Sequence, residues 1–167
     1  PPPATVCLCG TPLPFAMFEL VRLTENALQG VRKTDEKPPR VSVLDVIAAF
    51  LGKGPNNSTA KMAWKNLKDC YPDLVKKFDL YRFPGRGRST PVASAQGIVQ
   101  IIMVLPGRAA AGSRREAANL LVRYVGGDPS LVQEVEWNRL AQEQLPEDHP
   151  ARFFAESVES RPSLPVS

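Results

Sequence analysis

Residues that build disulfides, metal sites and catalytic centres are scarce in this chain of 167 residues. It contains three cysteines, Cys7, Cys9 and Cys70, and a single histidine, His149. Three cysteines at this spacing cannot form the disulfide framework of a small secreted protein. Cys7-x-Cys9 lacks the second ligand pair of a structural zinc site. We therefore expect a reduced, intracellular protein that binds no metal and no other cofactor.

Long apolar runs and catalytic motifs are also missing. No run reaches the roughly 18 to 20 apolar residues of a membrane-spanning helix, so we expect no membrane contact. The chain contains neither G-x-S-x-G nor H-E-x-x-H, and His149, in an acidic loop beside Pro150, is expected to face solvent. An enzyme is therefore not predicted. The weakest alternative is a metal-dependent nuclease built from four carboxylates: Asp45, Asp69, Asp73 and Asp79.

What the chain does have is an uneven distribution of charge. Its 21 Lys and Arg residues exceed its 17 Asp and Glu residues by only four. Residues 1–52 carry five charges of each sign, whereas residues 53–123 carry thirteen basic and four acidic residues, a net +9. Residues 124–167 carry three basic and eight acidic residues, a net −5. The basic segment predicts a surface for a polyanion, most often a nucleic acid, and the alternative is a solvated basic face.

Proline marks the two ends of the chain. Residues 1–16 form a Pro-rich leader and residues 161–167 a second Pro-containing tail. Between them we expect a domain at residues 17–127 and an acidic helical extension at residues 128–160. Because the chain begins with proline, we expect it to be a processed chain or part of a longer protein.

Apolar periodicity predicts a mainly helical, compact α+β domain. The predicted helices start at Ser42, at Ser58 and after Ser94, then at the capping box Ser113-Arg114-Arg115-Glu116, and finally at Pro129. Residues 109–112 before the capping box are a linker of small residues, with a helix as the alternative. The helix at 95–105 is apolar on nearly all sides and is expected to be buried. In the helix after Ser113, we expect Leu120, Leu121, Tyr124 and Val125 to face inward.

Alternating residues predict a small antiparallel sheet. Candidate strands lie at residues 18–23 and 28–34, and residues 79–92 form a predicted β-hairpin with a Gly/Arg turn at Pro84-Gly85-Arg86-Gly87-Arg88. This turn lacks the order G-x-x-x-x-G-K-[ST] of a phosphate-binding loop. Its glycines allow close approach of a partner, and the guanidinium groups of Arg86 and Arg88 suit phosphates or guanine edges. A plain solvated turn is the alternative.

Two further groups of cations complete the predicted site. Lys61, Lys65 and Lys68 fall in one stripe of the helix at 58–70, where they repel one another unless an anion lies against them. Arg114 and Arg115 are expected at the positive end of a helix dipole, a position that a bound phosphate would make favourable. The remaining predicted contacts are Arg82 and Arg108.

The segment from Val41 to Val125 resembles the Bro-N and KilA-N DNA-binding domains of large DNA viruses, phages and mobile elements. Three stretches carry this resemblance: Val43-Leu44-Asp45-Val46-Ile47, Thr90-Pro91-Val92 with Gly97-Ile98-Val99-Gln100-Ile101-Ile102, and Arg114-Arg115-Glu116-Ala117-Ala118. The family's W-V-x-x-E-V-L-P ending is replaced here by residues 121–127. The resemblance implies an α+β domain that binds DNA without catalysis.

The leading interpretation is therefore a non-catalytic DNA-binding module. Double-stranded DNA is the favoured partner, with single-stranded DNA or RNA as alternatives, and the compartment would be the nucleus in a eukaryote or the cytoplasm and nucleoid otherwise. The alternative is a protein-interaction or oligomerisation module that uses Trp137 and the pair Phe153-Phe154. Both readings are compatible with a homodimer that binds DNA.

Overall fold

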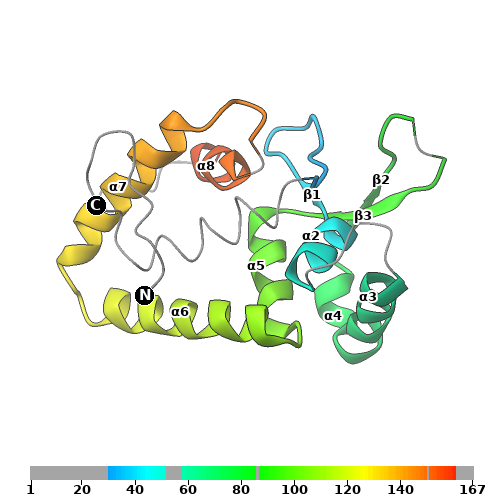
Figure 1. Cartoon of the computed structure of the whole chain (residues 1–167), viewed down its shortest axis with the longest axis horizontal. Coiled ribbons are helices and arrows are strands. Elements are labelled where there is room, and N and C mark those ends of the chain that lie inside the picture. The colour runs from blue at the N-terminus through cyan, green and yellow to red at the C-terminus, as the bar shows by residue number, and fades with distance from the viewer. Residues whose placement is uncertain (1–29, 52–57, 86, 150, 161–167) are drawn as a thin grey trace.

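A computed structural model describes residues 30–51, 58–85, 87–149 and 151–160 of the chain. Within these ranges the elements follow in the order β1 (Val41–Ser42), α2 (Val43–Phe50), α3 (Ser58–Cys70), α4 (Pro72–Val75), β2 (Asp79–Tyr81), β3 (Thr90–Ala93), α5 (Ala95–Val104), α6 (Arg108–Val125), α7 (Ser130–Gln144) and α8 (Arg152–Glu159). The fold is α+β and mainly helical, as the sequence predicts (Figure 1).

The three described strands form one antiparallel sheet in the order β1-β3-β2. The hairpin pairs Asp79 with Val92 and Tyr81 with Thr90, which confirms the hairpin predicted over residues 79–92. The other neighbour of β3 is the two-residue strand β1, through Val41 opposite Ala93. In the described part of the predicted strand at 28–34, only Lys33 makes a bridge, to Val41, so no regular strand forms there.

Two serine-capped helices, α2 and α5, contribute six of the thirteen residues of the buried apolar cluster. The hydroxyl of Ser42 accepts the backbone N–H of Asp45 at the start of α2, and that of Ser94 accepts the N–H of Gly97 at the start of α5. Each cap satisfies a donor that the first helical turn would otherwise leave unpaired. The buried apolar side chains of the sheet and these helices include Val43, Val46, Ile47, Val92, Ile98, Ile101 and Leu105.

Helix α5 is less buried than its composition predicts. Gly97, Ile98 and Ile101 are buried, but Val99 is 41% exposed. A Cβ atom at Gly97 would lie 2.9 Å from Cε1 of Phe78 and 3.1 Å from Cβ of Ala93, so glycine lets α5 approach the sheet closely. The helix therefore buries one face and exposes the opposite one.

The acidic extension contributes to the same core. Phe153 on α8 is only 2% exposed and belongs to the buried cluster with residues of α2 and α5. Lys33 and Glu156 make an ion pair of 2.7 Å between the loop before β1 and α8. The chain thus returns to the core after α7, which lies at the opposite end of the molecule from the hairpin (Figure 1).

Helix α6 begins five residues earlier than the predicted capping box. It starts at Arg108, and Ser113 is a buried residue inside it. Alanines at positions 109–111 favour the helical state, and Gly107 takes the positive φ of 112° that turns the chain before it. The prediction that Arg114 and Arg115 lie at a helix N-terminus is therefore wrong.

The C-terminal half of α6 is also not packed inward. Leu120, Leu121, Tyr124 and Val125 are 53%, 62%, 75% and 77% exposed, which contradicts the predicted inward face. The α6 helix has 18 residues and α5 has 10, or about 27 Å against about 15 Å. Helix α5 stands across the N-terminal end of α6, so the C-terminal half of α6 projects away from α5 (Figure 1).

None of the described helices is both long enough and apolar enough to cross a lipid bilayer.

Candidate nucleic-acid interface

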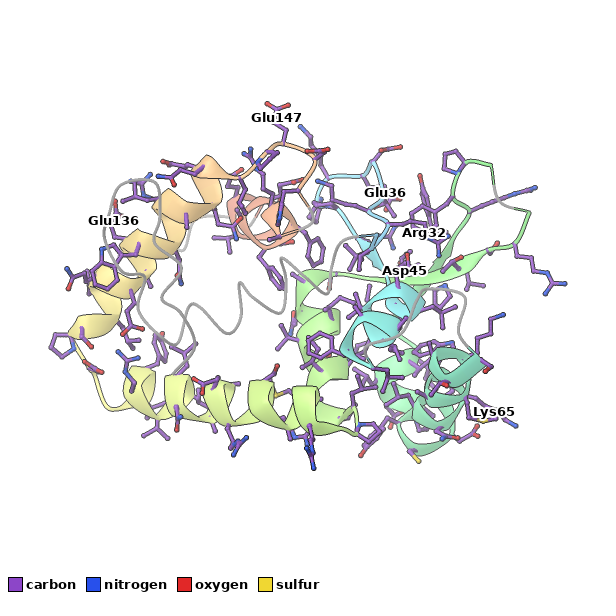
Figure 2. The ribbon with its side chains drawn as sticks, viewed as in Figure 1. Arg32, Glu36, Asp45, Lys65, Glu136 and Glu147 are labelled. Atoms are coloured by element: carbon purple, nitrogen blue, oxygen red, sulfur yellow. The ribbon has the colours of Figure 1, made fainter. Side chains whose placement is uncertain are left out.

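The predicted lysine stripe is present on the outer face of α3. Ala60 and Leu67 are buried on one side of this helix, while Lys61, Lys65 and Lys68 are all exposed. Lys65 lies at the margin of the molecule (Figure 2). The Lys68 ammonium is 6.0 Å from the ring centroid of Trp64, a distance at which a cation–π contact is weak. The stripe is thus open to solvent along its length.

The hairpin loop presents further cations at the same end of the molecule. Arg82 and Arg88 are exposed on either side of the loop, and Arg86 lies outside the described residues. Alternation explains the orientation of Arg82, because Phe83 beside it is buried. An open hollow of about 380 Å³ lies here, lined by Arg82, Phe83, Pro84, Gly85 and Gly87.

A buried ion pair fixes the base of this loop. The Asp45 carboxylate, 2% exposed, accepts hydrogen bonds from Nε of Arg32 at 2.8 Å, from its Nη2 at 3.0 Å and from its backbone N–H at 3.1 Å. The Arg32 guanidinium lies 4.6 Å from the centroid of the Phe83 ring, which meets Tyr81 edge-on at 4.9 Å. Hydrogen bonding to Asp45 raises the pKa of Arg32 further above its usual value.

This network connects the first turn of α2 to the hairpin (Figure 2). Its two charged members are thirteen residues apart in sequence, Arg32 before β1 and Asp45 inside α2. From the sequence, Asp45 is placed in the stretch that resembles Bro-N and KilA-N domains and in the four-carboxylate nuclease alternative, and Arg32 is not identified as its partner. An acidic residue in the first turn of an otherwise apolar helix was the available signal, because a carboxylate on a buried face requires a cationic partner.

The arginines of α6 separate into two groups. Arg108 and Arg115 are seven residues apart, which places both exposed side chains on one face of the helix. Arg114 points elsewhere, and its Nη1 donates to the carbonyl oxygen of Leu105 at 2.7 Å. Arg114 therefore holds the turn between α5 and α6, while Arg108 and Arg115 remain available to a ligand.

Most cations of this region have no carboxylate partner. Among the described residues from 58 to 115, only Lys76 of the basic side chains makes an ion pair, with Asp73. The exposed cations without an ion pair form what we call the basic surface: Lys61, Lys65, Lys68, Lys77, Arg82, Arg88, Arg108 and Arg115. Their charges are therefore not neutralised by ion pairs in the described part of the chain.

At the opposite end of the molecule, the arginines form ion pairs with carboxylates. We call residues 117–145, the end of α6 with α7, the arm. Arg123 pairs with Asp128 at 2.7 Å and with Glu134 at 2.5 Å, and Arg139 pairs with Glu136 and Glu143. Hydrogen bonds from Ser130 and Arg123 lower the pKa of Asp128 to about 2. Both arginines of the arm are thus neutralised by their own chain.

The carboxylates considered for a nuclease do not converge. Asp45 pairs with Arg32, Asp73 with Lys76, and Asp79 with Arg40. Within the described ranges, no group of three or more His, Cys, Asp and Glu side chains is placed to hold a metal ion. Cys7 and Cys9 lie outside those ranges.

The aromatic residues predicted for protein interaction differ in their exposure to solvent. Phe153 is 2% exposed, and the half-buried Phe154 packs against it with ring centroids 5.3 Å apart, so this pair is part of the core. Trp137 on α7 remains 36% exposed. The exposed apolar surface instead includes the end of α6, which the sequence analysis assigned to the interior.

Comparison of the chain with family models, with curated proteins and with solved structures finds no match. The resemblance to Bro-N and KilA-N domains therefore stays a prediction.

Proposed function

We propose that this chain is a non-catalytic DNA-binding module whose basic surface contacts the phosphate backbone. The observation that carries the proposal is the contrast in ion pairing. The arm neutralises Arg123 and Arg139 internally, whereas the basic surface holds eight exposed cations without a carboxylate in the described chain. A polyanion would supply the missing negative charge.

The two richest parts of the basic surface lie close enough in the fold to serve one ligand. Helix α3 and the β2–β3 hairpin occupy the same end of the molecule (Figure 1). Both contact α2, α3 directly and the hairpin through β3. The lysines of α3 suit phosphates, which position a protein on DNA, while the loop arginines suit insertion into a groove. Duplex DNA offers both features within one binding site.

The test is the salt dependence of duplex binding by fluorescence anisotropy between about 50 and 200 mM salt. If about five or six phosphates are neutralised, log K should fall with log salt at a slope near −5. The substitution Lys65→Gln should reduce the magnitude of that slope by about 0.9, and the triple substitution of Lys61, Lys65 and Lys68 by Ala by about 2.7. Arg139→Gln, which removes an exposed but paired cation, is the matched control and should leave the slope unchanged.

Three results would contradict the proposal. They are binding that ignores salt, a triple variant with unchanged affinity, or an effect of Arg139→Gln as large as that of Lys65→Gln. Parallel titrations with single-stranded DNA and RNA distinguish the kind of nucleic acid. Tighter binding to either of these would replace the duplex as the ligand while keeping the basic surface as the site.

A further inference from the structure

We infer that Ser89, in the hairpin loop, is the phosphoacceptor of an arginine-directed serine kinase, and that its phosphorylation weakens DNA binding. The inference deepens the proposed function, and its second half rests on that function. Ser89 lies directly before β3, with Arg88 next to it and Arg86 three residues before it in the sequence. Both Ser89 and Arg88 are exposed.

The hydroxyl of Ser89 is free to react. It is exposed and makes no hydrogen bond within the described part of the chain. Most other described hydroxyls are engaged in structure, as helix caps or as donors to nearby acceptors: Ser42, Ser94, Ser130, Ser157 and Ser160. A phosphate on Ser89 would therefore cost the fold no hydrogen bond of this hydroxyl.

The loop around Ser89 is open enough to enter the substrate groove of a kinase. A Cβ atom added at Gly85 or Gly87 would meet no atom within 4 Å, so no other part of the described chain covers the loop at these two positions. Ser89 itself belongs to no helix or strand. A kinase can therefore bind this segment in an extended form without unwinding a helix or opening the sheet.

The charges around Ser89 select the class of kinase. Kinases discriminate between substrates partly by charge, and guanidinium groups pair with carboxylates in a fixed bidentate geometry. Arg86 and Arg88 precede Ser89, and residues 80–115 contain no Asp or Glu at all. A kinase whose groove carries carboxylates fits this segment, whereas a kinase that reads acidic residues finds none.

The nearby alternative acceptors are less suited. Ser58 is also exposed and has no hydrogen bond within the described ranges, but no arginine lies within five residues of it on either side. Thr90 precedes Pro91, the pattern that a proline-directed kinase reads, yet it is only 8% exposed and is paired in β3. Exposure, a free hydroxyl and flanking arginines thus coincide at Ser89.

The reaction is a displacement on a nucleoside triphosphate. The Ser89 Oγ bonds to the terminal phosphorus as the bond from that phosphorus to the β-phosphate oxygen breaks. The hydroxyl proton passes to the carboxylate base of the kinase, and the nucleoside diphosphate leaves. The phosphoserine carries a charge of about −1.5 to −2 at pH 7 and three strong acceptor oxygens.

The register of the hairpin brings this phosphate to two cations of the basic surface. Tyr81 pairs with Thr90, so the register continued by one residue sets Arg82 opposite Ser89. Opposite residues of an antiparallel pair have Cβ atoms about 4.5–5.5 Å apart. The phosphate would thus lie within reach of Arg82 across the hairpin and of Arg88 beside it. Both arginines would then be occupied by the phosphate of their own chain and lost to DNA.

The first experiment identifies the acceptor. The full chain is incubated with magnesium ATP and either an arginine-directed or an acid-directed serine kinase, and phosphates are located by mass spectrometry of its peptides. We expect a phosphate on Ser89 with the arginine-directed kinase alone. Replacing Arg86 and Arg88 by Gln should slow this modification by about tenfold or more. Ser58→Ala is the matched control and should leave it unchanged.

Two results would overturn the inference at this stage. One is a Ser89 that the arginine-directed kinase leaves unmodified, and the other is equal modification of Ser89 by the acid-directed kinase. The variants replace exposed side chains, so their far-UV circular dichroism should match that of the wild type. The comparison therefore reports recognition by the kinase and not unfolding of the substrate.

The second experiment repeats the duplex titrations with the phosphorylated chain. Binding at about 0.1 M salt should be weaker by about tenfold or more, and the salt slope should fall in magnitude by about 1.8, the loss of two phosphate contacts. Ser89→Glu should lower the slope by about 0.9. Gln144→Glu adds the same charge at an exposed position of the arm and should leave the slope unchanged. Unchanged affinity of the phosphorylated chain would overturn the regulatory half of the inference.

The inference and the proposed function fail separately. An unmodified chain without affinity for DNA would refute the proposed function, while the peptide masses still decide whether Ser89 is the phosphoacceptor. A chain that binds DNA but whose Ser89 stays unmodified would refute the inference alone.

Discussion

The two ends of this molecule differ in which apolar side chains they bury and in which basic side chains they pair with carboxylates. The body, which comprises the sheet with α2–α5 and α8, buries most of its apolar side chains and leaves most of its described lysines without an ion pair. The arm exposes its apolar side chains and pairs its two arginines. The unpaired cations of the body are the ones that the proposed function assigns to an anionic ligand, and both arginines of the arm already have carboxylate partners.

The ion pairs of the body and of the arm also differ in burial, and therefore in how much they stabilise the fold. The Arg32–Asp45 pair in the body is buried on its acidic side and carries three hydrogen bonds to the carboxylate. The pairs of Arg139 in the arm are more than half exposed. Ion pairs in water contribute little to stability, whereas breaking a buried pair leaves an uncompensated charge.

The largest expected effect comes from removing the buried carboxylate. Asp45→Ala leaves the Arg32 guanidinium and its backbone N–H without their acceptor, and should cost about 3 kcal/mol of the free energy of unfolding. Urea denaturation should show a midpoint lower by about 1–2 M. Because Arg32 also contacts Phe83, the hairpin loop should become more susceptible to proteolysis at Arg82 or Arg88.

Glu136→Ala in the arm is the matched control for this change. It removes one exposed carboxylate of Arg139, while Glu143 remains as a partner. Its urea midpoint should not move measurably. Equal losses from Asp45→Ala and Glu136→Ala would mean that the body and the arm are not distinguished by burial.

A smaller effect follows from shortening one valine in each region. Val46 lies in α2 and is 1% exposed, whereas Val132 lies in α7 and is 76% exposed. Val46→Ala should cost about 2 kcal/mol, from two lost methyl groups and the cavity they leave. Val132→Ala should stay within about 0.5 kcal/mol, because alanine favours the helix and no packing is lost. Urea titrations of both variants at one concentration measure the difference, and a comparable loss at Val132 would show that α7 is packed.

The sequence predicted the body better than the arm because local signals decide its structure. Ser42 and Ser94 are caps that act over three residues, and both helices begin where these serines predict. The lysine stripe of α3 follows from helical periodicity alone. The Arg32–Asp45 pair was missed because it joins residues from different elements, which periodicity cannot connect.

The errors in α6 have a different physical origin. Periodicity identified the apolar stripe correctly, but it says which residues share a face and not whether another element reaches that face. Leu121 and Tyr124 are exposed because α5 meets α6 only near the N-terminal end of α6 (Figure 1). The capping box at Ser113 was overridden because positions 109–111 are alanines, which extend the helix back to Arg108.

The smallest expected effect is a pH dependence of the corner between α6 and α7. Hydrogen bonds from Ser130, followed by those from Arg123, lower the pKa of Asp128 from 3.8 to about 2. A carboxylate with a depressed pKa in the folded state stabilises that state above pH 3.8, and this contribution is lost as the pH falls through about 2. Asp128→Asn should therefore lower the melting temperature slightly at about pH 5 and by clearly less near pH 2.

The effect should be small because Asp128 is exposed to solvent and Glu134 continues to hold Arg123. Asp148→Asn is the control, since Asp148 is exposed and has no ion pair within the described residues. Thermal melts of both variants and the wild type at the two pH values measure the gap in melting temperature between each variant and the wild type. A gap for Asp128→Asn that persists at pH 2 would show that its hydrogen bonds with Ser130, not its charge, hold the corner.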